Sequence, residues 1–222
     1  MTSDAIDVLA IGDNDFPFHR FEEMGPHIAD AVGSERIDVA LTTEKGALEA
    51  PDADVVLDYL TDSTLTDGQQ EGLLSFVKSG GGYFGLHCAS DLTSTVPVDD
   101  EDVLDSRDEP IEELRDLVGG HFLTHPEQSA YGVRIVDSHH PITVSAPDLR
   151  VFDEPYVVDV SESVRVLARM DHPDHADMPV LWVQEYGDGR SAYCSIGHTV
   201  STLSNPDVAA LLRNCVRWSA GE

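Results

Sequence analysis

The segment Gly80-Gly81-Gly82-Tyr83-Phe84-Gly85-Leu86-His87-Cys88-Ala89-Ser90 indicates an α/β fold. The preceding run, residues 66–79, has apolar positions at helical spacing, and residues 83–86 form a short apolar run typical of a buried strand. Three chemically capable side chains, His87, Cys88 and Ser90, follow where that strand is expected to end. Because ligands bind outside the carboxyl ends of strands in open α/β sheets, this corner is a candidate active site.

The N-terminal half alternates between expected strands and expected helices. Strands are predicted over 6–11, 37–41 and 54–60, and helices over 21–32 and 66–79. We expect Gly25-Pro26 to lie near the start of the first helix or to break it. This alternation predicts a parallel, doubly wound sheet.

The C-terminal half differs from the N-terminal half because it contains many expected strands and few expected helices. An acidic region, 97–118, contains an expected helix over 110–118, and a second helix is expected over 205–218. Strands are predicted over 131–136, 156–160, 164–170, 180–186 and 191–196, with a hairpin turn at Gly187-Asp188-Gly189. We find no linker or repeat, so we expect a single domain over 1–222.

The charge balance is strongly acidic, with 42 acidic and 13 basic residues and a formal net charge of -29. This composition argues against binding to nucleic acid or to an anionic membrane, since both need clustered basic residues. A foldable sequence of such charge is typical of a halophile, where salt screens the self-repulsion. No secretory signal or membrane span is visible, and Cys88, Cys194 and Cys215 form no disulfide framework, so we expect a cytoplasmic protein.

Ten histidines are present, and three of them, His19, His87 and His198, follow predicted strands. The carboxyl ends of parallel strands meet at one crevice, so these imidazoles are expected to converge there. Imidazole suits both proton transfer and metal binding. His121 and His125 have the spacing of a helical metal pair, but the flanking glycines and proline predict a loop. The remaining histidines that we consider are expected in turns or solvated loops: His139, His140, His172 and His175.

Glu154 precedes an apolar strand that begins at Tyr156, which would desolvate its carboxylate and raise its pKa. Cys88 directly follows a strand and is therefore a candidate nucleophile, although a small buried cysteine is an equally ordinary interpretation. Cys194 and Cys215 are expected in the core.

An ordered series of motifs resembles the ThuA-like (trehalose-utilisation) family of the class I glutamine amidotransferase-like superfamily. The matching segments are 80–89, Gly119-Gly120-His121-Phe122, His125-Pro126, His140-Pro141-Ile142, Asp153-Glu154-Pro155-Tyr156, Pro179-Val180-Leu181-Trp182, Gly187-Asp188-Gly189-Arg190, Ile196-Gly197-His198 and Trp218. The resemblance implies a flavodoxin-like three-layer sandwich, with a mostly parallel central sheet and extra antiparallel strands in the C-terminal half. It also implies a role in sugar catabolism, together with oxidoreductases that make 3-keto sugars.

Two departures from the superfamily pattern bear on activity. Amidotransferases carry Gly-x-Cys-x-Gly, whereas here His87 stands at the cysteine position and Ala89 at the second glycine. Cys88 lies one residue after the position of the amidotransferase cysteine, so we do not expect a functional glutamine amidotransferase. The tryptophan that many relatives carry before Gly119 is also absent, and the polar residues Arg115 and Asp116 lie in that region.

The preferred function is an enzyme that cleaves or isomerises a sugar, 3-keto sugar or glycoside by acid/base chemistry. His87 and Glu154 are the expected acid and base, and the sequence leaves open a divalent ion, Zn²⁺ or Mn²⁺, since imidazole and carboxylate suit both. The candidate ligands are His19, His87, His125 and His198, and the candidate substrate-binding residues are Asn14, His19, His121, Tyr156 and His198. A non-catalytic sugar-binding module and a Cys88-dependent hydrolase remain as alternatives. The expected partners are a small carbohydrate and a sugar oxidoreductase, and the sequence leaves a homo-oligomer open.

Overall fold

A nine-stranded sheet, in the order β2-β1-β3-β4-β13-β12-β11-β8-β9, runs through the protein. The computed structural model describes residues 5–95 and 105–222. In chain order, the elements are β1 (Ile6–Gly12), α1 (Phe21–Val32), β2 (Ile37–Thr42), η1 (Lys45–Glu49), β3 (Val55–Tyr59), α2 (Asp67–Lys78), β4 (Gly82–Leu86), η2 (His87–Ser90), β5 (Ser94–Thr95), β6 (Asp105–Ser106), α3 (Glu112–Val118), β7 (Gly120–Thr124), β8 (Ser129–Ile135), β9 (Leu149–Asp153), β10 (Val157–Val160), β11 (Arg165–Asp171), β12 (Pro179–Tyr186), β13 (Gly189–Cys194), α4 (Val200–Leu203) and α5 (Pro206–Ser219).

The sheet is parallel in one half and antiparallel in the other. Strands β2, β1, β3, β4 and β13 pair in parallel, while β12, β11, β8 and β9 continue the sheet with antiparallel pairs. The hairpin turn after Tyr186, with Gly187 at φ +64°, joins β12 to β13. The expected fold, a parallel α/β sheet with extra antiparallel strands, is therefore confirmed.

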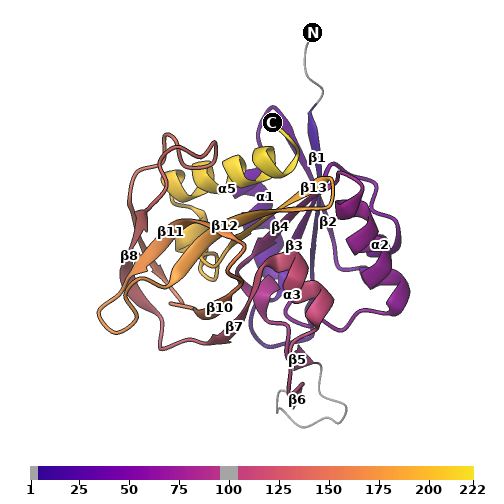
Figure 1. The fold of residues 1–222 in the computed structure, drawn as a ribbon, viewed down its shortest axis with the longest axis horizontal. Helices are drawn as coiled ribbons and strands as arrows, with labels where there is room; N and C mark the ends of the chain where they lie inside the picture. The colour runs from indigo at the N-terminus through magenta and orange to yellow at the C-terminus, as the bar shows by residue number, and fades with distance from the viewer. Residues whose placement is uncertain (1–4, 96–104) are drawn as a thin grey trace.

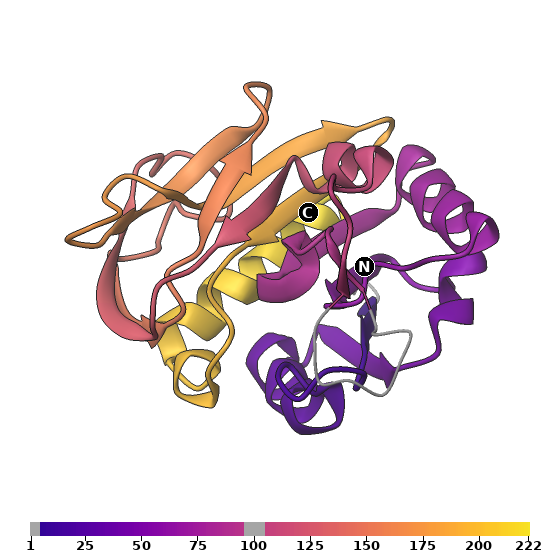
Figure 2. The ribbon, with the colours of Figure 1, turned by 90° about the horizontal axis from the view of Figure 1, so that it is seen from below.

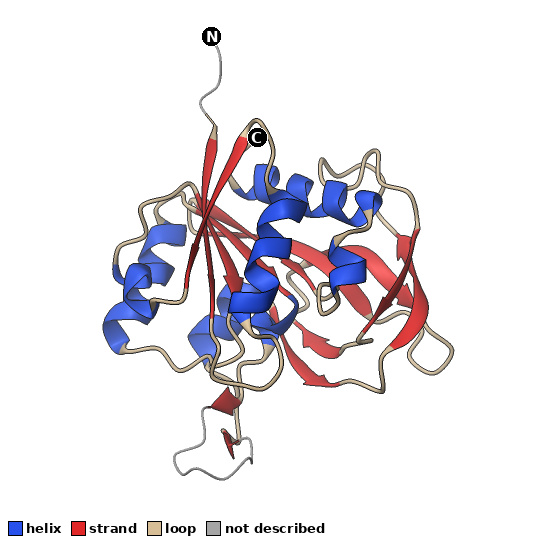
Figure 3. Cartoon of the chain, turned by 180° about the vertical axis from the view of Figure 1, so that it is seen from behind, coloured by secondary structure: helices blue, strands red, loops and turns tan. Residues whose placement is uncertain are grey.

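Helices cover both faces of the sheet, which gives three layers (Figures 1, 2 and 3). Helices α1, α4 and α5 contact one another on one face, and α2 and α3 pack against the other. Each face has its own apolar core; Ile28, Leu86 and Leu212 belong to one, and Leu73 and Trp182 to the other. The buried strand β4 lies between these cores, and its carboxyl end leads into η2.

Local sequence signals explain the helix boundaries, with one exception. A capping box between Thr66 and Gln69 begins α2, and the Asn205 side chain caps α5. Pro26 lies inside α1 without ending it, so the expectation that it starts or breaks the helix is wrong. Proline removes one backbone donor, and burial of the α1 face against α5 compensates for that loss. No helix among the described residues is long and apolar enough to cross a bilayer.

Two strands, β7 and β9, were not expected. The expected loop around His121 is instead β7, which pairs with β10. Strand β9 pairs with β8 at the edge of the large sheet. The expected helix over 110–118 is present as α3, and the part of the acidic region at 97–104 lies outside the described residues.

Asp58 in β3 provides a pH-dependent stability prediction. Its carboxylate accepts hydrogen bonds from the Leu60 backbone N–H and the Tyr83 hydroxyl, and burial raises its pKa to about 6. The folded state therefore binds this proton more tightly than the unfolded chain does, so stability falls as pH rises from about 4 to 6. We expect Asp58→Asn to stabilise the protein by about 1–2 kcal/mol at pH 7, and by much less at pH 4. Denaturant unfolding of both proteins at each pH measures this; an equal difference at both pH values would contradict it.

Candidate metal centre

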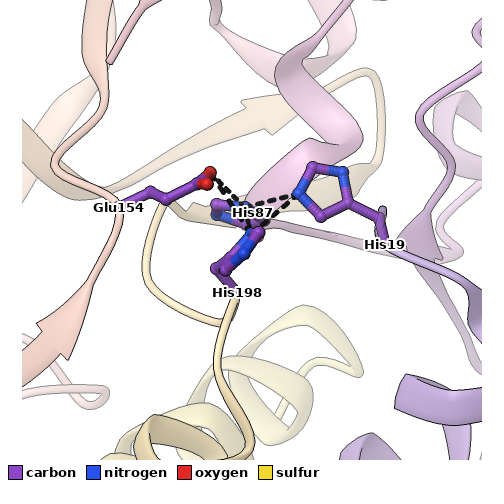
Figure 4. A group of neighbouring side chains, drawn as sticks. All are labelled: His19, His87, Glu154 and His198. Carbon is purple, nitrogen blue, oxygen red and sulfur yellow. Dashed lines mark hydrogen bonds and ion pairs between the residues drawn. The ribbon is translucent and has the colours of Figure 1, made fainter. Parts of the chain in front are cut away.

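Four side chains, His19, His87, Glu154 and His198, point toward one another at the carboxyl edge of the parallel strands (Figure 4). One donor atom from each lies within 4.8 Å of all the others. The His198 Nδ1 atom is 2.9 Å from His19 Nε2, 3.2 Å from His87 Nε2 and 3.2 Å from Glu154 Oε2. His87 Nε2 is 3.1 Å from His19 Nε2 and 3.5 Å from Glu154 Oε2.

The fold brings these residues together from four separate segments. His19 lies in the loop after β1, His87 follows β4 directly, and His198 follows β13. These three strands are parallel, so their carboxyl ends share one edge of the sheet, as the sequence predicts. Glu154 comes from another part of the sheet. It directly follows β9, which is the last strand of the sheet order, at the edge opposite β2.

Two of the histidines have an unusual backbone conformation. His19 and His87 have φ values of +55° and +48°, in the left-handed region that non-glycine residues seldom occupy. Such strain persists only where the surrounding structure holds it, and it concentrates at functional sites. Both residues therefore carry a local signature of function in addition to their convergence.

Contacts of the Nδ1 atoms orient the imidazole rings of His87 and His19. The His87 Nδ1 atom is 2.8 Å from the Ser195 carbonyl oxygen, which only accepts, so Nδ1 carries the proton and Nε2 offers its lone pair to the cluster. The His19 Nδ1 atom is 3.0 Å from the Thr61 hydroxyl. The backbone N–H of Thr61 in turn donates to the buried carboxylate of Asp13. Thr61 and Asp13 were not predicted as supporting residues. The available signal was their position, since Asp13 directly follows β1 and Thr61 lies two residues after β3.

The donor set fits a divalent transition metal. A tetrahedral ion with bonds of about 2.0–2.1 Å would hold its ligand atoms about 3.3 Å apart. Five of the six donor pairs are 2.9–3.5 Å apart, and the sixth, between His19 and Glu154, lies within 4.8 Å. Imidazole nitrogen and carboxylate oxygen suit both Zn²⁺ and Mn²⁺. Burial lowers the pKa of His19 well below its usual value and lowers the pKa of His198, with a further contribution from the neighbouring His87. Both rings therefore favour the neutral form that binds metal.

Glu154 differs from the sequence expectation. Burial alone would raise its pKa, but the neighbouring imidazoles, with His87 the largest contributor, outweigh burial and lower the pKa of this carboxyl group. The expected raised pKa is therefore wrong, because the expectation considered the apolar strand and not the imidazoles. Glu154 is an ionised carboxylate at neutral pH, suited to binding a cation.

Tyr156 and His125 lie beside the cluster. The Tyr156 hydroxyl is 3.0 Å from His87 Nε2, and burial raises its pKa well above the usual value, so it remains protonated. The His125 Nε2 atom is 3.9 Å from Glu154 Oε2, and its ring stacks on Tyr156. His125 is 38% exposed and its Nδ1 atom contacts the Pro126 carbonyl, so it lies outside the converging donor set that the sequence analysis had assigned it to.

Other predicted site residues have structural partners. The Asn14 side chain accepts a hydrogen bond from the Glu22 backbone at the start of α1. His121 lies in β7, where it accepts a hydrogen bond from Arg115, and burial lowers its pKa. The expectation of a solvated loop is wrong for His172, which is buried and contacts Ser129.

The cysteines are unsuited to nucleophilic chemistry. Cys88 is fully buried, its Sγ atom contacts the Tyr59 carbonyl, and burial raises its pKa well above the usual value. A thiol needs a lowered pKa and access to act as a nucleophile. Cys194 and Cys215 are buried in the core, as expected.

The fold and the cluster together define a flavodoxin-like α/β protein with a histidine-rich site at the carboxyl ends of its strands. The profile of the ThuA family, described as trehalose utilisation, matches residues 8–219, and the chain belongs to this family. No curated protein matches the sequence.

Solved structures support the same fold. A ThuA-like protein from Bacteroides uniformis is 17% identical with a TM-score of 0.74, covering 99% of this chain and 93% of its own. Another ThuA-like protein, from Parabacteroides merdae, is 19% identical with a TM-score of 0.71, covering 98% of this chain and 90% of its own. A β-galactosidase from Bacillus circulans is 16% identical with a TM-score of 0.66, and the match covers 95% of this chain but 30% of the enzyme.

Proposed function

We propose that this protein is a metal-assisted enzyme of carbohydrate metabolism that cleaves or isomerises a sugar, 3-keto sugar or glycoside. The observation that carries the proposal is the convergence of His19, His87, Glu154 and His198. The family description supports carbohydrate as the substrate class. When bound, a divalent cation would supply a Lewis acid that polarises a sugar carbonyl or hydroxyl oxygen.

Two side chains outside the donor set, Tyr156 and His125, are assigned the proton transfers. With His87 and Glu154 committed to the cation, Tyr156 and His125 are the adjacent groups outside the donor set. The protonated Tyr156 hydroxyl is positioned to donate to a substrate oxygen. The half-exposed His125 imidazole can accept a proton from the substrate and pass it to solvent. Without a cation, His87 Nε2 and Glu154 Oε2 lie 3.5 Å apart, and a proton held between them would make them the expected acid and base.

A specific observation favours the alternative, a sugar-binding module without catalysis. The site offers four protein donors, and zinc sites held by four protein ligands are typically structural. An ion of higher coordination number, such as Mn²⁺, would leave positions open for substrate. The identity of the bound ion therefore separates the two functions.

A proton NMR time course in molar KCl tests the proposal. The samples are 3-keto-glucosides and their unoxidised parent sugars, with metal-loaded protein and with chelator-treated protein. We expect turnover that chelator abolishes and Mn²⁺ or Zn²⁺ restores. Broadening of sugar signals without any product would support the binding module instead. Turnover that survives chelation would contradict the metal-assisted mechanism and leave His87 and Glu154 as the acid/base pair.

The cellular setting is also part of the proposal. We propose that the chain acts in the cytoplasm of a halophile, as one domain, on substrates that a sugar oxidoreductase supplies, and that homo-oligomers can form. A similar structure from Salmonella typhimurium LT2, 14% identical with a TM-score of 0.64, is described as a cytoplasmic protein.

The net charge of -29 leads to a salt prediction. At low salt the carboxylates repel one another over about 10 Å, and molar salt shortens that range to about 3 Å. We expect the thermal midpoint to rise as KCl is increased from about 0.1 to 1 M, because screening removes the self-repulsion. A sucrose series of matched osmolality controls for solute exclusion. A midpoint that KCl leaves unchanged would contradict the halophile assignment.

A further inference from the structure

A buried carboxylate, Asp153, lies next to the cluster formed by His19, His87, Glu154 and His198. It is the last residue of β9, and the alternation of that strand turns it inward with Leu149 and Val151. The residue is fully buried. Burying a carboxylate is costly unless hydrogen bonds satisfy it, so its partners need a specific explanation.

The partners of Asp153 are backbone groups of two cluster residues. Its Oδ1 atom accepts hydrogen bonds from the backbone N–H of Glu154 at 3.0 Å and of His198 at 3.2 Å. Its Oδ2 atom lies 3.5 Å from the Thr199 backbone nitrogen. Within residues 5–95 and 105–222, no basic side chain forms an ion pair with Asp153.

These hydrogen bonds join two segments that are far apart in the sequence. Glu154 follows the edge strand β9, whereas His198 follows β13 in the parallel part of the sheet. The hydroxyls of Thr199 and Thr202 also donate to the Phe152 carbonyl and reinforce the same junction. The distance of 3.2 Å between Glu154 Oε2 and His198 Nδ1 depends on this junction.

We propose that Asp153 is a positioning residue that sets Glu154 and His198 in place for a divalent cation. The inference rests on the proposed metal site, but its own carboxylate is not among the converging donor atoms. Outer-shell partners of this kind typically change metal affinity 10–100-fold when removed. The residue acts through backbone hydrogen bonds, so acceptor geometry, and not negative charge, is the property that matters.

Calorimetric titration of the chelator-treated full chain with Mn²⁺ and with Zn²⁺ tests the proposal. We expect Asp153→Ala to weaken binding about 10–100-fold, and Asp153→Asn, which keeps an Oδ1 acceptor, to weaken it less than about fivefold. Asp153→Ser, whose hydroxyl is too short to reach the His198 backbone, should resemble alanine and serves if the alanine variant does not fold. Leu73→Ala, in the core on the other side of the sheet, is the control that lowers the thermal midpoint without changing affinity.

The visible spectrum of the Co²⁺-loaded proteins gives a second readout, because it reports ligand geometry. We expect an altered spectrum for Asp153→Ala and the wild-type spectrum for Leu73→Ala. If Asp153→Ala binds metal within threefold of wild type, or if Asp153→Asn is as weak as alanine, the inference is wrong. If the wild-type protein binds neither Mn²⁺ nor Zn²⁺, the proposed metal site itself fails.

Discussion

Replacing His198 with alanine is expected to weaken Mn²⁺ or Zn²⁺ binding by at least about 1000-fold and to abolish chelator-sensitive turnover. His198 Nδ1 is the donor that lies closest to the other three, at 2.9–3.2 Å. Its loss leaves three donors, and the Asp153 bond to its backbone is retained. Calorimetric titration and the NMR assay measure the two effects.

A matched variant distinguishes loss of the site from a general effect of removing a histidine. His139 is exposed and lies in a turn outside the cluster, so His139→Ala should bind metal as the wild type does. His87→Asn is a second site variant, because asparagine tolerates the positive φ that His87 adopts. Unchanged metal affinity in His198→Ala would exclude this cluster as the binding site.

Replacing Gly189 with alanine is expected to destabilise the protein by about 3 kcal/mol or more, lowering its thermal midpoint by roughly 10 °C. Gly189 begins β13, next to the carboxyl end of α2. An added Cβ would lie 2.2 Å from the Val77 carbonyl oxygen and 2.3 Å from the Gly81 carbonyl oxygen. Both atoms belong to the backbone, so the clash requires β13 to move away from α2 and β4.

Gly46→Ala is the control for this steric effect. A Cβ at Gly46 would meet nothing within 4 Å, so that substitution should change the unfolding free energy by less than about 0.5 kcal/mol. Denaturant unfolding of both variants measures the difference. Equal stability of the two variants would show that the packing around Gly189 can relax.

The parallel half of the fold was predictable because its signals are local. The apolar runs of β1, β3 and β4 and the helical periodicity of α2 lie within short windows of sequence. The rule that ligands bind at strand carboxyl ends then places His19, His87 and His198 at one edge without any knowledge of side-chain contacts. Strands β7 and β9 were not predicted, because neither is a continuous apolar run: β7 begins with Gly120-His121, and Arg150 interrupts β9.

The sequence by itself determined the α/β class, the positions of most strands and helices, and the convergence of three histidines. Only the tertiary structure decided that Glu154, expected as acid or base with His87, is a fourth donor of the cluster, that its pKa is lowered, and that His125 stays outside the donor set. It also decided that Asp153 supports Glu154 and His198. The physical reason is that secondary structure follows from neighbouring residues, whereas a metal centre depends on distances between segments that only sheet pairing and core packing bring together.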